Sequence, residues 1–349
     1  MKDEARTARL LLLGAVFLAA CSGDGTEPLP LETAEVGVVL GSVDLSLTIF
    51  EVEDPKQTQL VGLAPAGSPV TLAVRGELAA VPLGFVPAVA VVDLKEGVVL
   101  WTVGLPEGSG ATGVAFLNDS IVLAANPNLN SVTPINVFAG TRGSDIQVGR
   151  FPQAIVVEGG RAFVLNAELE DFVPDGPATV SVIDIETLTV TSTIQLSGEN
   201  AATGGVGPDG RLYIVNSGSF GAANGSLSVV NLTSLSEAEY HAGFGDFPGS
   251  LALGPSSRAF VGAFSYGVVV WDTSLDSFIR GPTEALTPGG VASTSGVGFD
   301  EAGRLYTLTP DCQGPSTANR HDRMFEVDVT IPVGICPFAI AFTTIEAGS

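Results

Sequence analysis

Seven apolar segments that each end in a short acid or amide recur along this chain of 349 residues. Each segment is a short run rich in β-branched and aromatic residues, which is typical of a buried β-strand. The terminal residues lie 41 to 56 positions apart and are Glu51, Asp93, Asn136, Asp184, Asn231, Asp272 and Asp328. A repeat of this length predicts a β-propeller, in which each repeat forms one blade.

The repeat that contains Asp184 shows the expected content of one blade. It reads as four strands over 152–157, 161–166, 179–184 and 189–196, joined by turns rich in Gly, Pro and Asp. The second strand recurs along the chain with an arginine beside its turn, at Arg161, Arg211, Arg258 and Arg304. We expect these arginines to be structural, and the terminal acids and amides to accept hydrogen bonds from the following turn.

The two ends of the chain complement each other. First strands begin near positions 70, 114, 154, 204, 251, 297 and 338, and the last of these has no later strands to complete its blade. The segments 36–40, 45–50 and 57–63 lack a first strand. The sequence therefore predicts an all-β, seven-bladed propeller of four-stranded blades, closed by one C-terminal strand plus three N-terminal strands. Such closure leaves no long unpaired edge.

The first residues form a basic start followed by an apolar run, Leu10–Ala20, which is too short to span a bilayer as a helix. This pattern indicates a signal peptide. The run ends in Leu18-Ala19-Ala20-Cys21, which resembles the lipobox of bacterial lipoproteins and implies lipid attachment at Cys21. An ordinary secretory signal with a chance cysteine is the alternative.

The expected organisation is a lipoprotein signal peptide over 1–20, a tether over 21–33, the propeller over 34–344 and a C-terminal tail over 345–349. Ser22 follows the cysteine, as in lipoproteins sorted to the outer membrane. We therefore expect a lipid-anchored protein of the cell envelope, on the periplasmic or surface face of the outer membrane.

Charge excludes several classes of partner. The formal net charge is −23, with 15 Lys and Arg against 38 Asp and Glu. Such a chain repels phosphates, so nucleic acid is not an expected partner. Contact with a membrane is expected through the lipid anchor only, and we expect a monomer.

Cys312 and Cys336 remain as an even pair once Cys21 is assigned to lipid. Disulfides persist in an oxidising compartment, so we expect these two to pair and to stabilise the fold by roughly 3–4 kcal/mol. A metal site is the competing interpretation, but the chain has no CxxC motif and its histidines, His241 and His321, stand far apart. We therefore expect that Cys312 and Cys336 are not metal ligands.

The segments Gly210–Asn216 and Ser228–Asn231, with a Gly-rich loop between them, resemble the YVTN-type repeat of YncE-like seven-bladed propellers. The resemblance covers residues 34–344 and implies that the motif residues are structural. It implies functions in the cell envelope as binding proteins, while similar propellers include lactonases, a streptogramin lyase and quinoprotein subunits.

Long loops between second and third strands favour a binding function. They cover Ala167–Ala178, Ser217–Ser226 and Pro310–Asp322 and would emerge on one face, where rigid scaffolds often concentrate recognition. The candidate residues on this face are Glu168, Glu170, Asp171, Phe172, Phe220, Tyr266 and Asp311. They predict a non-catalytic scaffold for a protein or small-molecule ligand, with the acids favouring a cationic partner.

Two alternatives stay open. The acid-rich loop 168–175 offers oxygen ligands for calcium, although it lacks the EF-hand spacing and also fits a solvated loop. The protein could also be a propeller enzyme, a lactonase-like hydrolase or a lyase, with a metal-assisted site in the central channel. That function needs clustered carboxylates and a histidine near the axis. The sequence assigns no catalytic residue, because no HExxH or GxSxG motif is present.

Overall fold

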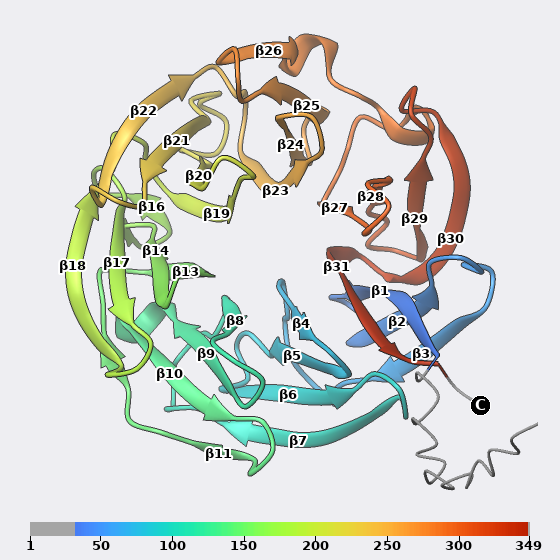
Figure 1. Ribbon diagram of the computed structural model, residues 1–349, viewed down its shortest axis with the longest axis horizontal. Coiled ribbons are helices and arrows are strands. Elements are labelled where there is room, and N and C mark those ends of the chain that lie inside the picture. Colours follow the sequence, from blue (N-terminus) through green and yellow to red (C-terminus); the bar gives the residue numbers. More distant parts are fainter. Residues whose placement is uncertain (1–31, 348–349) are drawn as a thin grey trace, which may run out of the picture. The chain divides into compact units, whose positions relative to one another are not determined.

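Seven antiparallel sheets are arranged in a ring around a central axis in the computed structural model, which describes residues 32–347 (Figure 1). From the axis outward, blade 1 contains β31 (Pro337–Glu346), β1 (Thr33–Gly41), β2 (Ser46–Glu51) and β3 (Thr58–Gly62). Blade 2 contains β4 (Ala73–Arg75), β5 (Leu78–Pro82), β6 (Ala88–Asp93) and β7 (Val98–Gly104). Blade 3 contains β8 (Val114–Phe116), β9 (Ile121–Asn126), β10 (Ser131–Asn136) and β11 (Thr141–Arg142), with β12 (Ile146–Gln147) also paired to β10.

The other four blades repeat this order. Blade 4 contains β13 (Pro152–Glu158), β14 (Arg161–Asn166), β17 (Thr179–Asp184) and β18 (Thr189–Gln195). Blade 5 contains β19 (Ala201–Val206), β20 (Arg211–Asn216), β21 (Ser226–Asn231) and β22 (Ser236–Ala242). Blade 6 contains β23 (Pro248–Gly254), β24 (Arg258–Ala263), β25 (Gly267–Asp272) and β26 (Ser277–Arg280). Blade 7 contains β27 (Gly296–Phe299), β28 (Leu305–Thr309), β29 (Pro315–His321) and β30 (Val327–Ile335).

The predicted closure is confirmed. β31 pairs antiparallel with β1 from Thr33 opposite Glu346 to Gly41 opposite Pro337, so one C-terminal strand completes the N-terminal sheet (Figure 1). The expected signal peptide, Cys21 and most of the tether lie outside the described residues. Within residues 32–347, no helix is long and apolar enough to cross a membrane.

Five of the seven strand-terminal acids and amides cap the turns that follow them, whereas no such hydrogen bond to Glu51 is found among the described residues. Asp184 Oδ1, for example, accepts hydrogen bonds from the backbone N–H groups of Glu186 and Thr187 at 3.1 and 2.8 Å. The bonds from Thr187 lower the pKa of Asp184, because they stabilise the charged carboxylate. Equivalent caps are made by Asp93, Asn136, Asn231 and Asp272.

One predicted strand and one predicted loop in blade 7 are wrong. The third strand there is β29, whereas residues 323–326 form a turn and Asp328 lies in β30, where it binds Arg320. The turn is capped by Asp322, whose Oδ1 accepts from the N–H groups of Met324 and Glu326. The error arose because β29 reads Pro-Ser-Thr-Ala-Asn-Arg-His and has no apolar alternation. The long loop predicted over Pro310–Asp322 is therefore short.

A buried asparagine closes the second strand of three consecutive blades. The Nδ2 group of Asn166 donates to Thr179 Oγ1 and Ser181 Oγ on the third strand, both at 3.0 Å. Asn126 and Asn216 bind two hydroxyls each in the same way, and all three side chains are fully buried. These contacts show that the asparagine at the end of the Gly210–Asn216 segment is structural, because it joins two strands of one sheet.

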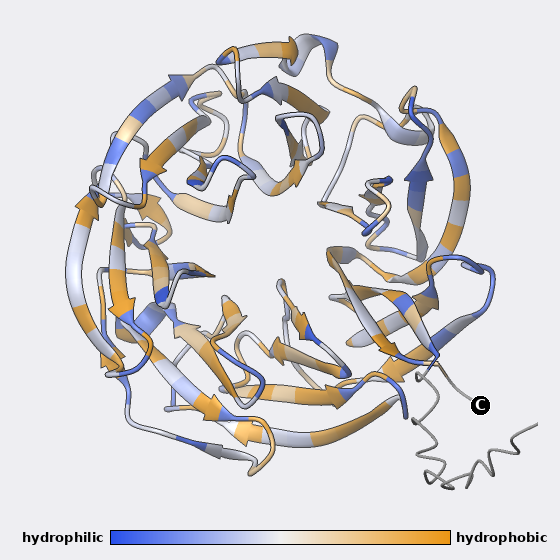
Figure 2. Ribbon diagram, viewed as in Figure 1, coloured by the Kyte–Doolittle hydropathy of each residue, from blue (hydrophilic) through white to orange (hydrophobic). Residues whose placement is uncertain are grey.

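Apolar side chains fill the space between neighbouring blades. The two middle strands of each blade are mostly buried, and hydrophobic residues dominate most of them in Figure 2, with the polar β29 of blade 7 as an exception. Outer strands such as β22 alternate between exposed and half-buried residues. Arg211 and Arg304 bridge blades as well, because Arg211 donates to the backbone oxygen of Thr273 in blade 6 and Arg304 to Glu53 in blade 1. The expectation that these two arginines are structural is confirmed.

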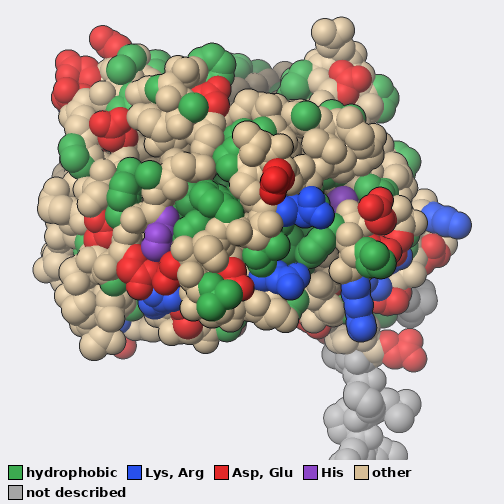
Figure 3. All heavy atoms as spheres, turned by 90° about the horizontal axis from the view of Figure 1, so that it is seen from above, with side chains coloured by type: hydrophobic (Ala, Val, Ile, Leu, Met, Phe, Trp, Pro, Cys, Tyr) green, Lys and Arg blue, Asp and Glu red, His purple; other side chains and the backbone are tan. Residues whose placement is uncertain are grey.

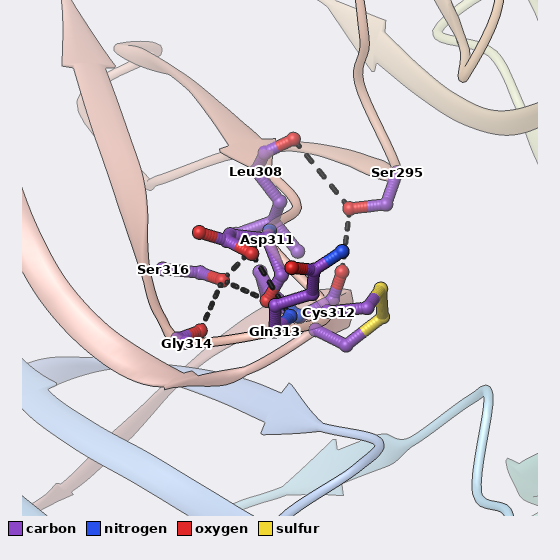
Figure 4. The surroundings of a disulfide bond; sticks show 9 residues. Ser295, Leu308, Asp311, Cys312, Gln313, Gly314 and Ser316 are labelled. Atoms are coloured by element: carbon purple, nitrogen blue, oxygen red, sulfur yellow. Dashed lines mark hydrogen bonds between the residues drawn. A yellow bond between two sulfur atoms is a disulfide. The ribbon is translucent and has the colours of Figure 1, made fainter.

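The predicted disulfide joins Cys312, which follows β28, to Cys336, which lies between β30 and β31. The two Cα atoms are 4.3 Å apart. Figure 4 shows the bond beside the Asp311–Gly314 turn, where Asp311 accepts a hydrogen bond from the backbone N–H of Gln313 at 2.9 Å. The disulfide therefore ties the last complete blade to the strand that closes the ring.

Candidate functional site

A cavity of about 560 Å³ lies at one mouth of the central channel. Its walls come from the first residues of the inner strands and from the loops that enter them or join second to third strands. We call this side of the ring the loop face. The lining includes Val70 and Leu72 from the entry to β4, Leu251 from β23 and Ile340 from β31. Residues from distant parts of the sequence thus share one site.

A glycine allows two neighbouring inner strands to approach each other closely at the loop face. Gly113 precedes β8, and a Cβ atom placed there would lie 2.5 Å from the backbone oxygen of Gln153 at the start of β13. Such a contact is far shorter than van der Waals packing allows. A larger side chain at Gly113 would therefore push blades 3 and 4 apart at the loop face.

Phenylalanines surround the mouth in three edge-on or tilted pairs. Phe151 contacts Phe172 with ring centroids 5.6 Å apart, and Phe264 contacts Phe338 at the same separation. The third pair joins Phe247, which lines the cavity, to the exposed Phe220 at 5.7 Å. Such pairs are favourable by about 0.5–1.5 kcal/mol each, so the rings hold one another in place around the opening.

Two of these rings are carried by strained backbone. Phe151 and Phe247 have positive φ angles of 55° and 52°, and each directly precedes the proline that begins an inner strand. A bulky residue in the left-handed region costs of order 1–3 kcal/mol, so the surrounding structure must hold it there. The effect is to place one aromatic ring at the same point of entry in blades 4 and 6.

The polar groups of the cavity are incompletely paired. Gln153 donates to Asn200 Oδ1 at 2.7 Å, and Asn200 donates to the backbone oxygen of Gly218 at 3.0 Å. By contrast, the hydroxyl oxygens of Ser250 and Thr294 are buried and have no hydrogen-bond partner among the described residues. Both residues line the cavity. Buried hydroxyls normally find a partner, but neither of these oxygens has exposed surface, so neither is open to a molecule in the cavity.

No ionisable side chain is among the described residues that line the cavity. His321 lies within blade 7, where its Nε2 is 2.9 Å from Thr307 Oγ1 and its Nδ1 is 3.0 Å from the backbone oxygen of Phe325. Burial lowers the pKa of His321, which keeps the ring neutral. His241 lies on the outermost strand of blade 5. The described part of the chain thus brings neither histidine to the channel mouth.

The structure separates the loop residues that the sequence grouped as candidates. Phe172 lines the cavity and Phe220 packs beside it, both more than three-quarters exposed. The Tyr266 hydroxyl instead donates inward to the backbone oxygen of Phe244, and burial raises its pKa. Asp311 accepts from a backbone N–H in the turn next to the disulfide.

The acid-rich loop is held by one arginine that lies outside it. Its residues form a small hairpin of β15 (Leu169–Glu170) and β16 (Val173–Pro174). Arg150 lies within ion-pairing distance of Glu168, Glu170 and Asp175, at 3.6, 3.6 and 2.7 Å. Glu168 also accepts a hydrogen bond from Thr179 at 2.7 Å. Asp171 is exposed at the tip of the hairpin. One arginine therefore holds three of the carboxylates that could otherwise have met a cation.

The sequence reasoning missed most of the cavity lining. Phe151, Phe247 and Phe338 each adjoin the proline that begins an inner strand, so aromatic residues beside Pro152, Pro248 and Pro337 were a usable signal. Ser250 and Thr294 carried no such signal, because their place at the axis depends on how the blades pack.

Comparisons with known proteins support the fold. No protein-family model matches the sequence. No curated protein matches it either. Among solved structures, the chain is similar to hydrazine synthase from Kuenenia stuttgartiensis, with a TM-score of 0.63 and 14% sequence identity. The match covers 82% of this chain and 97% of the other, and at this identity it bears on the β-propeller fold alone.

Proposed function

We propose that this protein is a non-catalytic binding protein of the cell envelope that holds a small, uncharged and largely apolar molecule at the loop face. The observation that carries this proposal is the cavity itself. Its volume of about 560 Å³ falls within the usual range for small-molecule sites, and such sites combine apolar walls with a few placed polar groups.

The chemistry of the ligand follows from the lining. Phe172, Phe247 and Phe264 offer aromatic surface, and Gln153 and Asn200, which are hydrogen-bonded to each other, supply polar groups in the lining. No charged side chain faces the cavity among the described residues, so an ion that entered would lose its hydration without gaining a counter-charge. The net charge of −23 further disfavours anions.

The alternative of an enzyme receives less support. A hydrolase or lyase of the kind considered above needs carboxylates and a histidine that converge near the axis. The cavity lining lacks both residue types among the described residues. The lipid anchor at Cys21, the outer-membrane address and the relationship to YVTN-type propellers remain part of this proposal and rest on the sequence.

Two dyes that share one aromatic body test the site. Phenylnaphthylamine is neutral, and anilinonaphthalene sulfonate adds a negative charge to the same rings. We expect the neutral dye to bind one site per chain with enhanced fluorescence, and the sulfonate to bind at least about tenfold more weakly, the equivalent of about 1.4 kcal/mol.

Variants locate the dye. Phe172→Ala together with Phe264→Ala should weaken binding of the neutral dye about tenfold or more, because each ring is an aromatic anchor at the mouth. Phe138→Ala is the matched control, since Phe138 is 61% exposed in the turn after β10 and does not line the cavity. The proposal would be contradicted if both dyes bound with equal affinity, or if Phe138→Ala weakened binding of the neutral dye as much as the double variant does.

A further inference from the structure

We propose that Glu239, His241 and Asp276 form a binding site for a divalent transition-metal ion, represented by Zn²⁺, on the outer wall between blades 5 and 6. This site lies away from the channel and does not depend on the function proposed above. Each residue offers one ligand atom, and the three atoms lie within 4.8 Å of one another. Zn²⁺ is commonly bound by just such imidazole nitrogens and carboxylate oxygens.

The fold explains how the three residues meet. Glu239 and His241 are two positions apart on β22, so both side chains leave the same side of that strand. Asp276 comes from the next blade, in the turn between β25 and β26. It occupies the left-handed position of this turn with a φ of 51°, a conformation that Asp and Asn tolerate better than most residues.

The distances between ligand atoms are close to those that a metal requires. His241 Nε2 is 3.3 Å from Glu239 Oε2 and 3.7 Å from Asp276 Oδ1. Ligands about 2.1 Å from a tetrahedral Zn²⁺ lie about 3.4 Å from one another. Small side-chain rotations therefore suffice to bring the three atoms onto one ion, and water would complete the coordination.

Neighbouring groups orient two of the ligands. The imidazole of His241 packs against the indole of Trp271 with ring centroids 4.8 Å apart. Arg211 donates to Glu239 Oε1 at 2.9 Å, which leaves Oε2 directed at His241. Partners behind metal ligands commonly fix ligand orientation in this way.

The local charge favours a cation. Asp209, Glu239 and Asp276 supply three negative charges against the single positive charge of Arg211. Among the described residues, no group donates a hydrogen bond to the Asp276 carboxylate, and His241 Nε2 lies 3.7 Å from it. Figure 3 shows carboxylates, arginines and histidines intermingled on the outer wall.

The competing interpretation is an ion pair without metal, in which a protonated His241 binds both carboxylates. Isothermal titration of the full-length, chelator-treated chain with Zn²⁺ alone separates the two. We expect one Zn²⁺ per chain, loss of that binding in His241→Gln, and at least tenfold weaker binding in Asp276→Asn. Loss of a residue that orients a metal ligand typically lowers metal affinity 10–100-fold. Loss of a direct ligand should lower the affinity for Zn²⁺ by at least as much.

Asp171→Asn is the matched control. Asp171 is also an exposed aspartate at φ 51°, but it lies in the acid-rich loop of blade 4. Zn²⁺ binding should be unchanged in this variant. A second readout is Co²⁺, whose visible absorption on binding should disappear in His241→Gln. Should His241→Gln fail to fold, Asp276→Asn and Glu239→Gln test the same site. The proposal is wrong if the parent chain binds no Zn²⁺, or if these variants bind it as tightly as the parent.

Discussion

Removal of the Cys312–Cys336 disulfide should destabilise the whole propeller, because the bond ties blade 7 to the strand that closes the ring. The two cysteines are 24 positions apart. In the chain-entropy relation, a closed loop of this length restricts the unfolded chain by about 3.5 kcal/mol at 25 °C. The double variant Cys312→Ser/Cys336→Ser should therefore lose about 3 kcal/mol of unfolding free energy.

The native contacts around the bond should survive its loss. The Cys336 backbone N–H donates to Asp311 O at 3.0 Å, and the Ser42 N–H donates to Cys336 O at 3.0 Å. The first of these bonds holds the two cysteine segments together without the sulfur atoms, and the second holds Cys336 against blade 1. The loss should consequently arise mainly in the unfolded state, where the chain regains the freedom that the bond removes.

Urea unfolding measured by tryptophan fluorescence, with and without a thiol reductant, checks the magnitude. Reductant should lower the unfolding midpoint of the parent to that of the double variant and should leave the double variant unchanged. If the free energies of unfolding of the oxidised and reduced parent differed by less than about 1 kcal/mol, the entropic reasoning would be refuted. An equal effect of reductant on the double variant would show that another reducible group is responsible.

Three further outcomes follow from the structure. Deletion of residues 337–349 removes β31 and opens the ring, so the truncated chain should melt far below the parent, and an equal melting temperature would argue against closure by this strand. Because burial lowers the pKa of His321, the unfolded chain binds a proton more readily than the native chain. Stability should therefore fall as the pH drops below about 6.5, and His321→Gln should show a flatter pH dependence in the same denaturation assay. Mass spectrometry of membrane-extracted protein should find lipid on Cys21, and an unmodified Cys21 would remove the basis for the envelope anchor.

Repetition made most of the fold predictable from the sequence. Most blades carry apolar strands and a capping acid or amide such as Asp184, and three of them a buried asparagine such as Asn166, and these signals act through neighbours close in the chain. The prediction failed where that local signal was absent. β29 is polar, and the apolar residues just after it, Met324 and Phe325, belong to a turn.

The candidate site was much less predictable. The sequence placed Phe172 and Phe220 on one loop face, and both lie at the mouth of the channel. It could not show that Arg150 pairs with three carboxylates of the acid-rich loop, because Arg150 precedes β13 while its partners follow β14. Nor could it show that Tyr266 turns inward, since that direction depends on the backbone of Phe244.

The sequence alone determined the number of blades, the closure of the ring and the pairing of Cys312 with Cys336, because these follow from repeat spacing, strand counts and residue chemistry. Only the tertiary structure decided what meets at the axis and on the outer wall. The phenylalanines of the mouth come from different blades, and His241 meets Asp276 across the boundary between two blades. Such contacts depend on how one sheet packs against the next, and the periodicity of a single blade carries no record of that packing.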